Sequence, residues 1–315
     1  MLRGKRVLIT GASGFVGSYL ARYLHEKGFE IWGTYRRRKE KLPLRLRWLR
    51  ADLTDFREAL RTVRSSRPTY VFHLAGQAVP RKAWEDPELT YRLNVGASVF
   101  LLEGIARFAP TARVVLVSTS QVYGSTFFAK ERVCETDPVN PVTPYGASKL
   151  LMELVGLNFF KQHRVDIVIA RAFNHVGRSQ NASFVFADFC RQVAMIEKKR
   201  KRPVLNVGNV SVTRDFVHVR DAARAYHILA VRGKSGEIYN VGSEKGTNLK
   251  EVIRYLKKES RTPFEVFSSK SRRQRNDVSC AISDCSKLRR LGWEPRESTW
   301  KALQEILEDW RERVK

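Results

Sequence analysis

Short runs of apolar and β-branched residues alternate with helical patterns along the first half of the chain. The runs at 6–10, 31–35, 70–74, 113–117 and 165–170 predict buried strands. Apolar residues recur at helical spacing from Val16 to the expected C-cap at Gly28, and again near 55–65, 87–108 and 145–162. Continuous apolar strands separated by helices are typical of a parallel sheet covered on both faces. The pattern therefore predicts an α/β fold with a doubly wound parallel sheet.

The alternation becomes irregular after about residue 172, where the segments near 172–212 and 234–285 are richer in Gly, Asn, Ser and Arg. We expect a first domain formed by 1–172 together with returning segments near 213–242. The segments 173–212 and 243–315 are expected to form mainly a smaller C-terminal, substrate-binding lobe. This lobe is placed over the carboxyl edge of the sheet because open α/β sheets bind ligands there.

The charge of the chain is strongly unbalanced. Its 315 residues include 58 Lys and Arg against 32 Asp and Glu, a formal net charge of +26. Such a charge attracts anions, which include nucleic acids, acidic membranes and phosphorylated small molecules. Basic residues cluster at 36–39, at 198–202 and around Arg273 and Arg275. The cluster 198–202 is expected on the surface at the end of a helix that starts near Ser183, because cations favour a helix C-terminus.

Other sequence features limit the compartment and the chemistry. Apolar runs are too short for a membrane helix, which needs about 18 uninterrupted residues, and the N-terminus lacks the apolar region and cleavage site of a signal peptide. The four cysteines, Cys134, Cys190, Cys280 and Cys285, are scattered without metal-ligand spacing. These features predict a cytoplasmic protein without a disulfide framework or a metal site.

A glycine-rich turn follows the first predicted strand and opens the first helix. Its spacing is GxxGxxG, and its candidate cofactor contacts are Gly11, Ser13, Gly14, Phe15, Val16 and Gly17. Glycines there permit a tight turn, and the free N–H groups of the helix N-terminus can bind a pyrophosphate. The turn therefore predicts a Rossmann-type dinucleotide-binding domain.

The end of the second strand indicates which dinucleotide is bound. An acidic residue there would accept from the ribose 2′-hydroxyl of NAD, but this chain has Tyr35 followed by Arg36, Arg37 and Arg38. Arginine can bind a 2′-phosphate and stack on adenine. We therefore expect NADP(H) rather than NAD(H), with Arg36 as the main contact and Arg37 or Arg38 in support. Asp52 is a candidate acceptor for the adenine amino group, with helix capping as its competing role.

Tyr145 and Lys149 are four residues apart in a predicted helix that Pro144 opens, so they lie on one face. The hydroxyl of Thr119 is expected at the carboxyl end of the preceding strand. We expect the ammonium of Lys149, with an oxidised nicotinamide ring, to lower the pKa of Tyr145 from about 10. The pair would then act as an acid–base catalyst that interconverts an alcohol and a ketone.

Several ordered motifs together resemble the extended short-chain dehydrogenase/reductase family, whose members act on nucleotide-activated sugars. The resemblance spans nearly the whole chain. It is closest to the GDP-6-deoxy-D-mannose reductases and the GDP-mannose 4,6-dehydratases. The motifs are the glycine-rich turn, His73-Leu74-Ala75-Gly76-Gln77, Asn94-Val95, Ser118-Thr119 with Val122-Tyr123-Gly124, Tyr145 with Lys149, Ala172-Phe173-Asn174-His175-Val176-Gly177, Arg214-Asp215-Phe216-Val217, Tyr239-Asn240-Val241-Gly242-Ser243 and Gly292-Trp293-Glu294-Pro295.

The resemblance implies an NAD(P)-dependent oxidoreductase and assigns roles to further residues. The implied catalytic residues are Thr119, Tyr145 and Lys149. The implied cofactor contacts beyond the glycine-rich turn and the second strand are Leu53, Leu74, Ala75, Gly76, Asn94, Tyr145 and Lys149. The implied contacts to a nucleotide-diphosphate sugar, most simply a GDP sugar, are Gln77, Ser120, Gln121, Asn174, Val185, Arg214, Arg273 and Arg275.

Two departures from the family pattern affect the substrate site. The family usually has Gly-Pro-Gly-Gln after its Asn-His pair, whereas this chain has Gly177-Arg178-Ser179-Gln180. The late phosphate-binding arginine of the family would align with Gln274, which Arg273 and Arg275 flank. A shift of one residue would restore that contact.

The residues after Thr119 separate the possible reactions. Dehydratases of the family carry acidic residues there, but Ser120 and Gln121 cannot take up a proton at neutral pH. This favours NADPH-dependent reduction of a C4 ketone, most simply GDP-4-keto-6-deoxy-D-mannose to GDP-D-rhamnose. The alternatives are another nucleotide-sugar reductase or 4-epimerase, a GDP-mannose 4,6-dehydratase, and a cofactor-sensing or RNA-binding Rossmann protein. A nucleic-acid-binding protein would have no use for Thr119, Tyr145 and Lys149 in these relative positions.

The helices near 87–108 and 145–162 carry apolar faces. Their residues are Leu93, Phe100 and Leu101 on the first helix and Leu151, Leu154 and Leu157 on the second. In the family, such helices pair as a four-helix bundle between two subunits, so a homodimer is expected. The alternative is burial against the subunit's own sheet.

Overall fold

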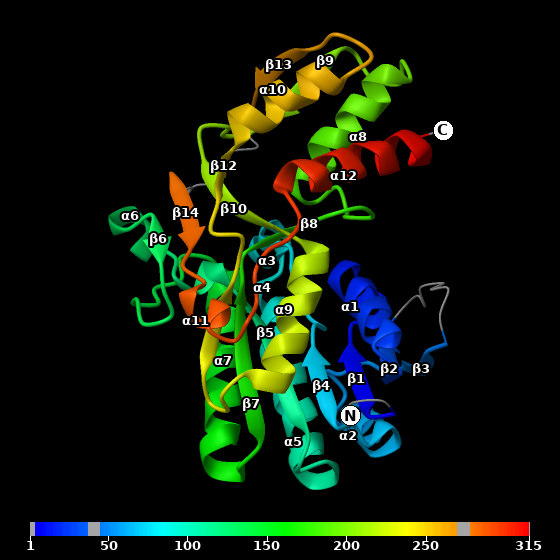
Figure 1. The fold of residues 1–315 in the computed structure, drawn as a ribbon, viewed down its shortest axis with the longest axis vertical. Helices are drawn as coiled ribbons and strands as arrows, with labels where there is room; N and C mark the ends of the chain where they lie inside the picture. The colour runs from blue at the N-terminus through cyan, green and yellow to red at the C-terminus, as the bar shows by residue number, and fades with distance from the viewer. Residues whose placement is uncertain (1–3, 37–44, 270–277, 315) are drawn as a thin grey trace.

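The structure is a computed structural model that describes residues 4–36, 45–269 and 278–314. Within these ranges the main sheet has seven parallel strands in the order β11-β7-β5-β4-β1-β2-β3 (Figure 1). The strands are β1 (Arg6–Thr10), β2 (Glu30–Tyr35), β3 (Arg47–Arg50), β4 (Tyr70–His73), β5 (Arg113–Thr119), β7 (Asp166–Ala172) and β11 (Ile238–Val241). The strand order reverses between β1 and β4, and such a switch point opens a ligand-binding crevice at the carboxyl ends of the strands. The predicted Rossmann-type α/β fold is confirmed.

Helices cover both faces of this sheet. On one face, α1 (Phe15–Glu26) and α9 (Val219–Arg232) pack against buried residues of β1, β2 and β7. On the other face lie α2 (Phe56–Ser66), α5 (Ala97–Phe108) and α7 (Pro144–His163). Gly28 follows α1 with φ +83°, a left-handed conformation that favours glycine and ends the helix.

The second part of the molecule lies beyond the carboxyl edge of the main sheet, at the top of Figure 1. Its strands are β6 (Arg132–Val133), β8 (Asn174–Val176), β10 (Thr213–His218), β12 (Gly246–Asn248) and β14 (Cys280–Ser283), with a separate pair of β9 (Val204–Val207) and β13 (Glu265–Ser268). Its helices are α8 (Val185–Glu197), α10 (Leu249–Glu259) and α12 (Thr299–Arg313). The short α11 (Ser286–Arg289) instead contacts β11, and its Leu288 packs in the core of the main sheet. Strand β6 comes from the first half of the chain but pairs with β14.

The predicted helix at 87–108 is interrupted. The chain forms α3 (Pro80–Glu85), α4 (Pro87–Tyr91), a π-helical turn η1 (Arg92–Gly96) and then α5. The side chain of Asn94 in this turn is fully buried and hydrogen-bonded, and π-turns frequently occur at functional sites. The other short helices are η2 (Ser120–Val122) and α6 (Thr126–Ala129).

The two faces proposed for a dimer are only partly exposed. Leu101 was expected on such a face, but it is 0% exposed because it packs in the core beneath α5. Phe100 packs edge to face against Phe56, with ring centroids 5.3 Å apart. Leu151 and Leu154 on α7 are exposed by 43% and 54%. Of the residues expected on these faces, Leu151 and Leu154 on α7 are thus the exposed ones.

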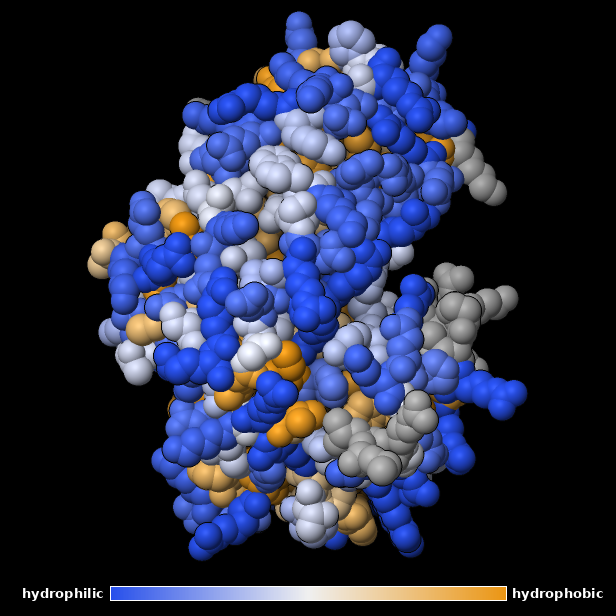
Figure 2. All heavy atoms as spheres, in the orientation of Figure 1, coloured by the Kyte–Doolittle hydropathy of each residue, from blue (hydrophilic) through white to orange (hydrophobic). Residues whose placement is uncertain are grey.

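The surface is dominated by charge. Helix α8 ends at Glu197 and Lys198 is its C-cap, so the cluster 198–202 lies at a helix C-terminus as predicted. The face drawn in Figure 2 is mostly hydrophilic, with small apolar areas. None of the described helices is long and apolar enough to cross a membrane.

Candidate active site

The glycine-rich turn forms a cradle at the switch point of the sheet. Gly11 has φ +69°, and its N–H donates to Thr34 Oγ1 at 3.0 Å. A Cβ added at Gly17 would lie 2.3 Å from the Gly11 carbonyl oxygen. Gly14 is the N-cap of α1, and within the described chain no side chain caps this helix. The exposed N–H groups and the missing Cβ atoms fit the diphosphate of a dinucleotide.

The end of β4 lies directly against this turn. The N–H groups of Leu74 and Ala75 both donate to Thr10 Oγ1 at 3.2 Å. A Cβ added at Gly76 would lie 2.5 Å from Asn94 Oδ1, and Gly76 has φ +154°. Only glycine fits there, so the segment after β4 stays close to both the glycine-rich turn and the π-helical turn.

A buried hydrogen-bond chain connects Thr10, just before the glycine-rich turn, to Ser148 on α7. His73 bonds to Thr10 Oγ1 through Nδ1 and to Ser98 Oγ through Nε2, each at 2.8 Å. Ser98 donates to the Asn94 carbonyl at 2.7 Å, and Asn94 Nδ2 donates to Ser148 Oγ at 2.9 Å. Burial lowers the pKa of His73 to about 3, with the charge of Lys149 acting in the same direction. His73 is therefore neutral at pH 7.

The predicted adenosine-binding residues lie at the ends of β2 and β3. Tyr35 packs edge to face against Trp48 at 5.9 Å, and Arg36 is exposed. Burial would raise the pKa of Asp52, but the hydrogen bonds from Thr54 and the charge of Arg36 outweigh it and lower that pKa. Arg36 and the Asp52 carboxylate therefore interact electrostatically. Arg37 and Arg38 lie outside the described residues.

The capping role considered for Asp52 belongs to Asp55. The Asp55 side chain accepts from Glu58 N at 2.9 Å as the N-cap of α2. Asp52 Oδ1 instead accepts from Thr54 N at 3.0 Å and from Thr54 Oγ1 at 2.7 Å. Leu53 between them is buried. The second oxygen of Asp52 is the part of this side chain that an adenine amino group could use.

The three predicted catalytic residues meet where β5 contacts the start of α7. Thr143 caps α7 by accepting from Gly146 N at 2.9 Å, and Pro144 occupies the first turn. Tyr145 is 8% exposed and forms a hydrogen bond with Thr119. Lys149 donates from Nζ to the Val117 carbonyl at 2.9 Å.

The expected lowering of the Tyr145 pKa, which included the charge of an oxidised nicotinamide ring, stays a prediction, but burial acts against it. Burial raises the pKa of Tyr145 to about 12, and the hydrogen bond with Thr119 offsets only part of that effect. The ammonium of Lys149 is directed at the Val117 carbonyl. A buried phenol with this pKa is protonated at neutral pH, so Tyr145 is set up to donate a proton.

Burial also shifts Lys149. It lowers the pKa of Lys149 to about 8, while the negative charge of Glu153 acts in the opposite direction. Lys149 is thus largely charged at pH 7.

The residues after Thr119 carry no acid. Ser120 and Gln121 form the start of η2, and Gln121 N donates to Thr119 Oγ1 at 3.3 Å. Gln121 Oε1 accepts from Thr143 Oγ1 at 3.1 Å. These contacts connect the segment to the start of α7. They supply hydrogen bonds but no group that changes its protonation at neutral pH.

The predicted substrate residues are distributed over both parts of the molecule. Asn174 on β8 donates from Nδ2 to the Asp215 carbonyl at 2.9 Å, which places it beside Arg214 on β10. Val185 begins α8 and packs against the core of the second part. Gln77 donates from Nε2 to the Val79 carbonyl at 2.7 Å, so its side chain is engaged in its own turn. Arg273 and Arg275 lie outside the described residues.

The basic turn that replaces the usual Gly-Pro-Gly is held by α12. The guanidinium of Arg178 pairs with Glu312, and its Nε lies 3.5 Å from Asp309 Oδ1. Ser179 N donates to Asp309 Oδ2 at 3.0 Å, and Tyr19 OH donates to the Arg178 carbonyl at 3.1 Å. The turn is therefore fixed by ion pairs and hydrogen bonds rather than by proline.

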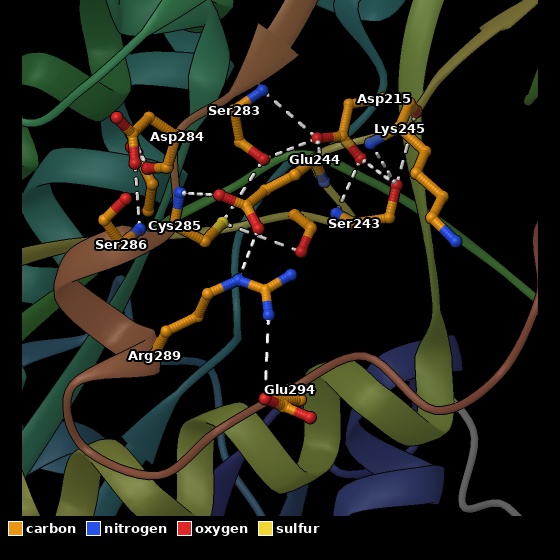
Figure 3. Close-up of polar contacts among 12 residues, drawn as sticks. Asp215, Ser243, Glu244, Lys245, Ser283, Asp284, Cys285, Ser286, Arg289 and Glu294 are labelled. Atoms are coloured by element: carbon orange, nitrogen blue, oxygen red, sulfur yellow. Dashed lines mark hydrogen bonds and ion pairs between the residues drawn. The ribbon is translucent and has the colours of Figure 1, made fainter.

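A buried carboxylate, which sequence reasoning did not single out, supports Arg214. Asp215 is 0% exposed and accepts from Ser243 N and Oγ at 2.7 Å, from Glu244 N at 3.0 Å and from Ser283 N at 3.1 Å (Figure 3). These donors belong to the loop after β11 and to β14. Asp215 thus joins the main sheet to the second part at the strand that carries Arg214. A short acidic residue between an arginine and an apolar run was the available signal.

The cradle gives a direct test. Gly17→Ala places a methyl group against the Gly11 carbonyl, so we expect NADPH affinity to fall at least about tenfold, measured by fluorescence titration. Gly96→Ala is the matched control, because a Cβ there meets no described atom within 4 Å. Unchanged affinity in Gly17→Ala would contradict the assignment of the turn.

Comparison with known proteins agrees with this geometry. The family model described as GDP-mannose 4,6 dehydratase matches residues 8–306. The chain is 30% identical over 312 residues to the GDP-6-deoxy-D-mannose reductase of Pseudomonas aeruginosa, covering 99% of both chains. A solved structure of RMD from Pseudomonas aeruginosa complexed with NADPH has a TM-score of 0.86 at 29% identity, covering 98% of this chain and 100% of that one.

A further solved structure, MoeE5 in complex with UDP-glucose and NAD, has a TM-score of 0.87 at 28% identity and covers 98% of this chain and 100% of its own. Neighbours complexed with NADPH or NAD support a nicotinamide cofactor for this chain. The chain therefore belongs to the GDP-mannose 4,6-dehydratase family, among the extended short-chain dehydrogenases/reductases, and is an oxidoreductase-type enzyme.

Proposed function

We propose that this enzyme uses NADPH to reduce the C4 ketone of a nucleotide-activated 4-keto-6-deoxy sugar, converting GDP-4-keto-6-deoxy-D-mannose to GDP-D-rhamnose. The observation that carries the proposal is the buried, protonated Tyr145 hydrogen-bonded to Thr119. The two residues after Thr119, Ser120 and Gln121, are not acids. This arrangement supplies one proton to a carbonyl oxygen and lacks an acid–base pair for elimination. The 30% identity to a GDP-6-deoxy-D-mannose reductase supports the GDP-linked substrate.

Each residue of the site would have a separate role in this reaction. The nicotinamide cofactor, when bound in its reduced form, supplies the hydride to C4. Tyr145 donates its phenolic proton to the same carbonyl oxygen, so that hydride and proton together give the alcohol. Thr119 stabilises the developing negative charge on that oxygen by a hydrogen bond. Lys149 holds the nicotinamide ribose, and Asn174 and Arg214 hold the diphosphate of the substrate.

The nucleotide and the reaction are tested together by a substrate panel. The enzyme is mixed with NADPH and with GDP-, dTDP- or UDP-linked 4-keto-6-deoxy sugars, and the loss of NADPH absorbance is followed. We expect the highest kcat/KM with the GDP sugar. Consumption of the UDP sugar alone would indicate a UDP-sugar reductase instead. The structural similarity to MoeE5, solved with UDP-glucose and NAD, would support that result. No consumption with any of the three would contradict reduction.

The role of Tyr145 predicts a kinetic effect. Tyr145→Phe removes the proton donor but keeps the ring, so kcat should fall about 10²-fold or more while NADPH affinity stays nearly unchanged. Steady-state kinetics and fluorescence titration measure the two quantities. A loss of kcat below about fivefold would mean that another group donates the proton.

The exposed Arg36, which follows the end of β2 where an acidic residue would favour NAD, supports NADP(H) as the preferred cofactor. The wild-type enzyme should bind NADPH at least about tenfold more tightly than NADH, and Arg36→Ala should remove most of that difference, because a charge-assisted contact to the 2′-phosphate is lost. Affinity titrations with both cofactors measure it. Equal affinities in the wild type would reject the preference.

We also propose a homodimer formed through α5 and α7. Leu154 is 54% exposed on α7, and the neighbouring helix α3 exposes Trp84 by 59%, so an apolar surface is available there. Leu154→Glu should produce monomers, measured by light scattering at micromolar concentration. Phe128→Glu, at a residue on α6 that is 61% exposed, is the control and should remain dimeric. A monomeric wild-type enzyme would contradict the dimer.

A further inference from the structure

Glu153 on α7 is a buried carboxylate that the mechanism above does not use. Its side chain is 2% exposed, and the partner Arg171 on β7 is 4% exposed. Arg171 donates from Nη2 to Glu153 Oε2 at 2.8 Å and from Nε to Oε1 at 3.1 Å. Ser118 on β5 donates from Oγ to Glu153 Oε1 at 2.5 Å. Ser118 and Arg171 are register partners, so one carboxylate holds α7 against two adjacent strands.

This carboxylate continues the catalytic face of α7. Tyr145, Lys149 and Glu153 follow one another at intervals of four residues, which places them on one side of the helix. Consecutive residues of β5 contact the three: Thr119 bonds Tyr145, the Val117 carbonyl bonds Lys149, and Ser118 bonds Glu153. The register of the helix on the strand is therefore set partly by Glu153.

A buried ion pair often adds little to the free energy of unfolding compared with apolar side chains of the same size. Stability alone therefore does not explain why Glu153 and Arg171 are charged residues. Lys149 is buried one turn away, and burial disfavours its charged form. Among the described titratable and charged groups around Lys149, His73 from β4 and Tyr145 from α7 are neutral at pH 7, and Arg171 from β7 is a cation. The negative charge that favours the Lys149 ammonium comes from Glu153.

We propose that Glu153 is a positioning residue of the active site, whose carboxylate fixes α7 on β5 and β7 and keeps the Lys149 ammonium charged for cofactor binding. This assignment rests on the proposed role of Lys149. Removing the negative charge should lower the pKa of Lys149 further below its present value of about 8. Lys149 then loses its proton at a lower pH, so the decline in NADPH affinity and in kcat on the alkaline side should begin at a lower pH.

The same shift has a stability signature with a defined sign. The pKa of Lys149 is about 8 in the folded protein, below its unfolded value of about 10.4, so the unfolded chain binds more protons between these values and stability rises with pH across that window. In a variant without the charge of Glu153, this rise of stability with pH should begin at a lower pH. Urea unfolding at a series of pH values measures this without any substrate.

The variants must separate charge from packing. Glu153→Gln alone leaves the Arg171 guanidinium buried without its carboxylate, so the test variant is the double replacement Glu153→Gln with Arg171→Met, which substitutes neutral side chains of similar size. Glu197→Gln with Arg311→Met is the matched control. This ion pair in the second part of the molecule is also largely buried, with Arg311 Nη2 donating to Glu197 Oε1 at 2.8 Å. Glu153→Asp is the conservative variant.

The experiment measures NADPH affinity by fluorescence from about pH 6 to about pH 10 for each protein. The double variant at Glu153 should lose affinity at a pH about one unit lower than wild type, or about fivefold at pH 8, while Glu153→Asp and the control keep the wild-type profile. Identical profiles for both double variants would overturn the role of Glu153. A wild-type enzyme that bound no nicotinamide cofactor at any pH would instead overturn the proposed function, and this assignment with it.

Discussion

The contact between the end of β5 and the first turns of α7 is the constraint on which the site depends. Lys149 bonds the Val117 carbonyl and Tyr145 bonds Thr119, so a central strand of the sheet sets the position of the catalytic helix. Thr143 and Pro144 determine where that helix begins, and hence which side of it faces the strand. A shift of one residue would rotate the Tyr145 side chain by about a third of a turn, away from Thr119.

Burial in this contact also determines the charges that the chemistry uses. The low-polarity surroundings keep Tyr145 protonated, keep His73 neutral and weaken the hold of Lys149 on its proton. A protonated phenol beside a substrate ketone suits reduction. The reverse reaction would need the phenolate, which the positive ring of an oxidised nicotinamide would favour. In the proposed reaction, the direction of catalysis would therefore depend on which form of the cofactor is bound.

The sequence was sufficient for the parts of the structure that depend on local pattern. Apolar runs located β1, β2, β4, β5 and β7 of the main sheet but not the edge strands β3 and β11. The glycine spacing located the turn at Gly11–Gly17 because only residues without Cβ fit so close to a carbonyl. It did not predict the π-helical turn around Asn94, whose geometry follows from tertiary hydrogen bonds. Nor did it predict that β6 pairs with β14, since two-residue strands have no periodicity to detect.

The candidate site divides in the same way. Tyr145 and Lys149 were placed together by helical spacing alone, but their pKa values depend on burial, which the spacing does not contain. The sequence showed Arg178 only as a departure from the family pattern, because its partners on α12 are more than a hundred residues away in the sequence. Asp215 entered only as part of a family motif, and Glu153 was not singled out, because the sequence does not distinguish a buried acid from a surface acid until its hydrogen-bond donors are known.

The proposed reduction requires direct transfer of a hydride from NADPH to the sugar. NADPH deuterated at the transferable position of the nicotinamide is incubated with the enzyme and GDP-4-keto-6-deoxy-D-mannose, and the product is analysed by NMR and mass spectrometry. Reduction predicts deuterium on C4 of the sugar in proportion to the NADPH oxidised. A product without deuterium at C4 would contradict it.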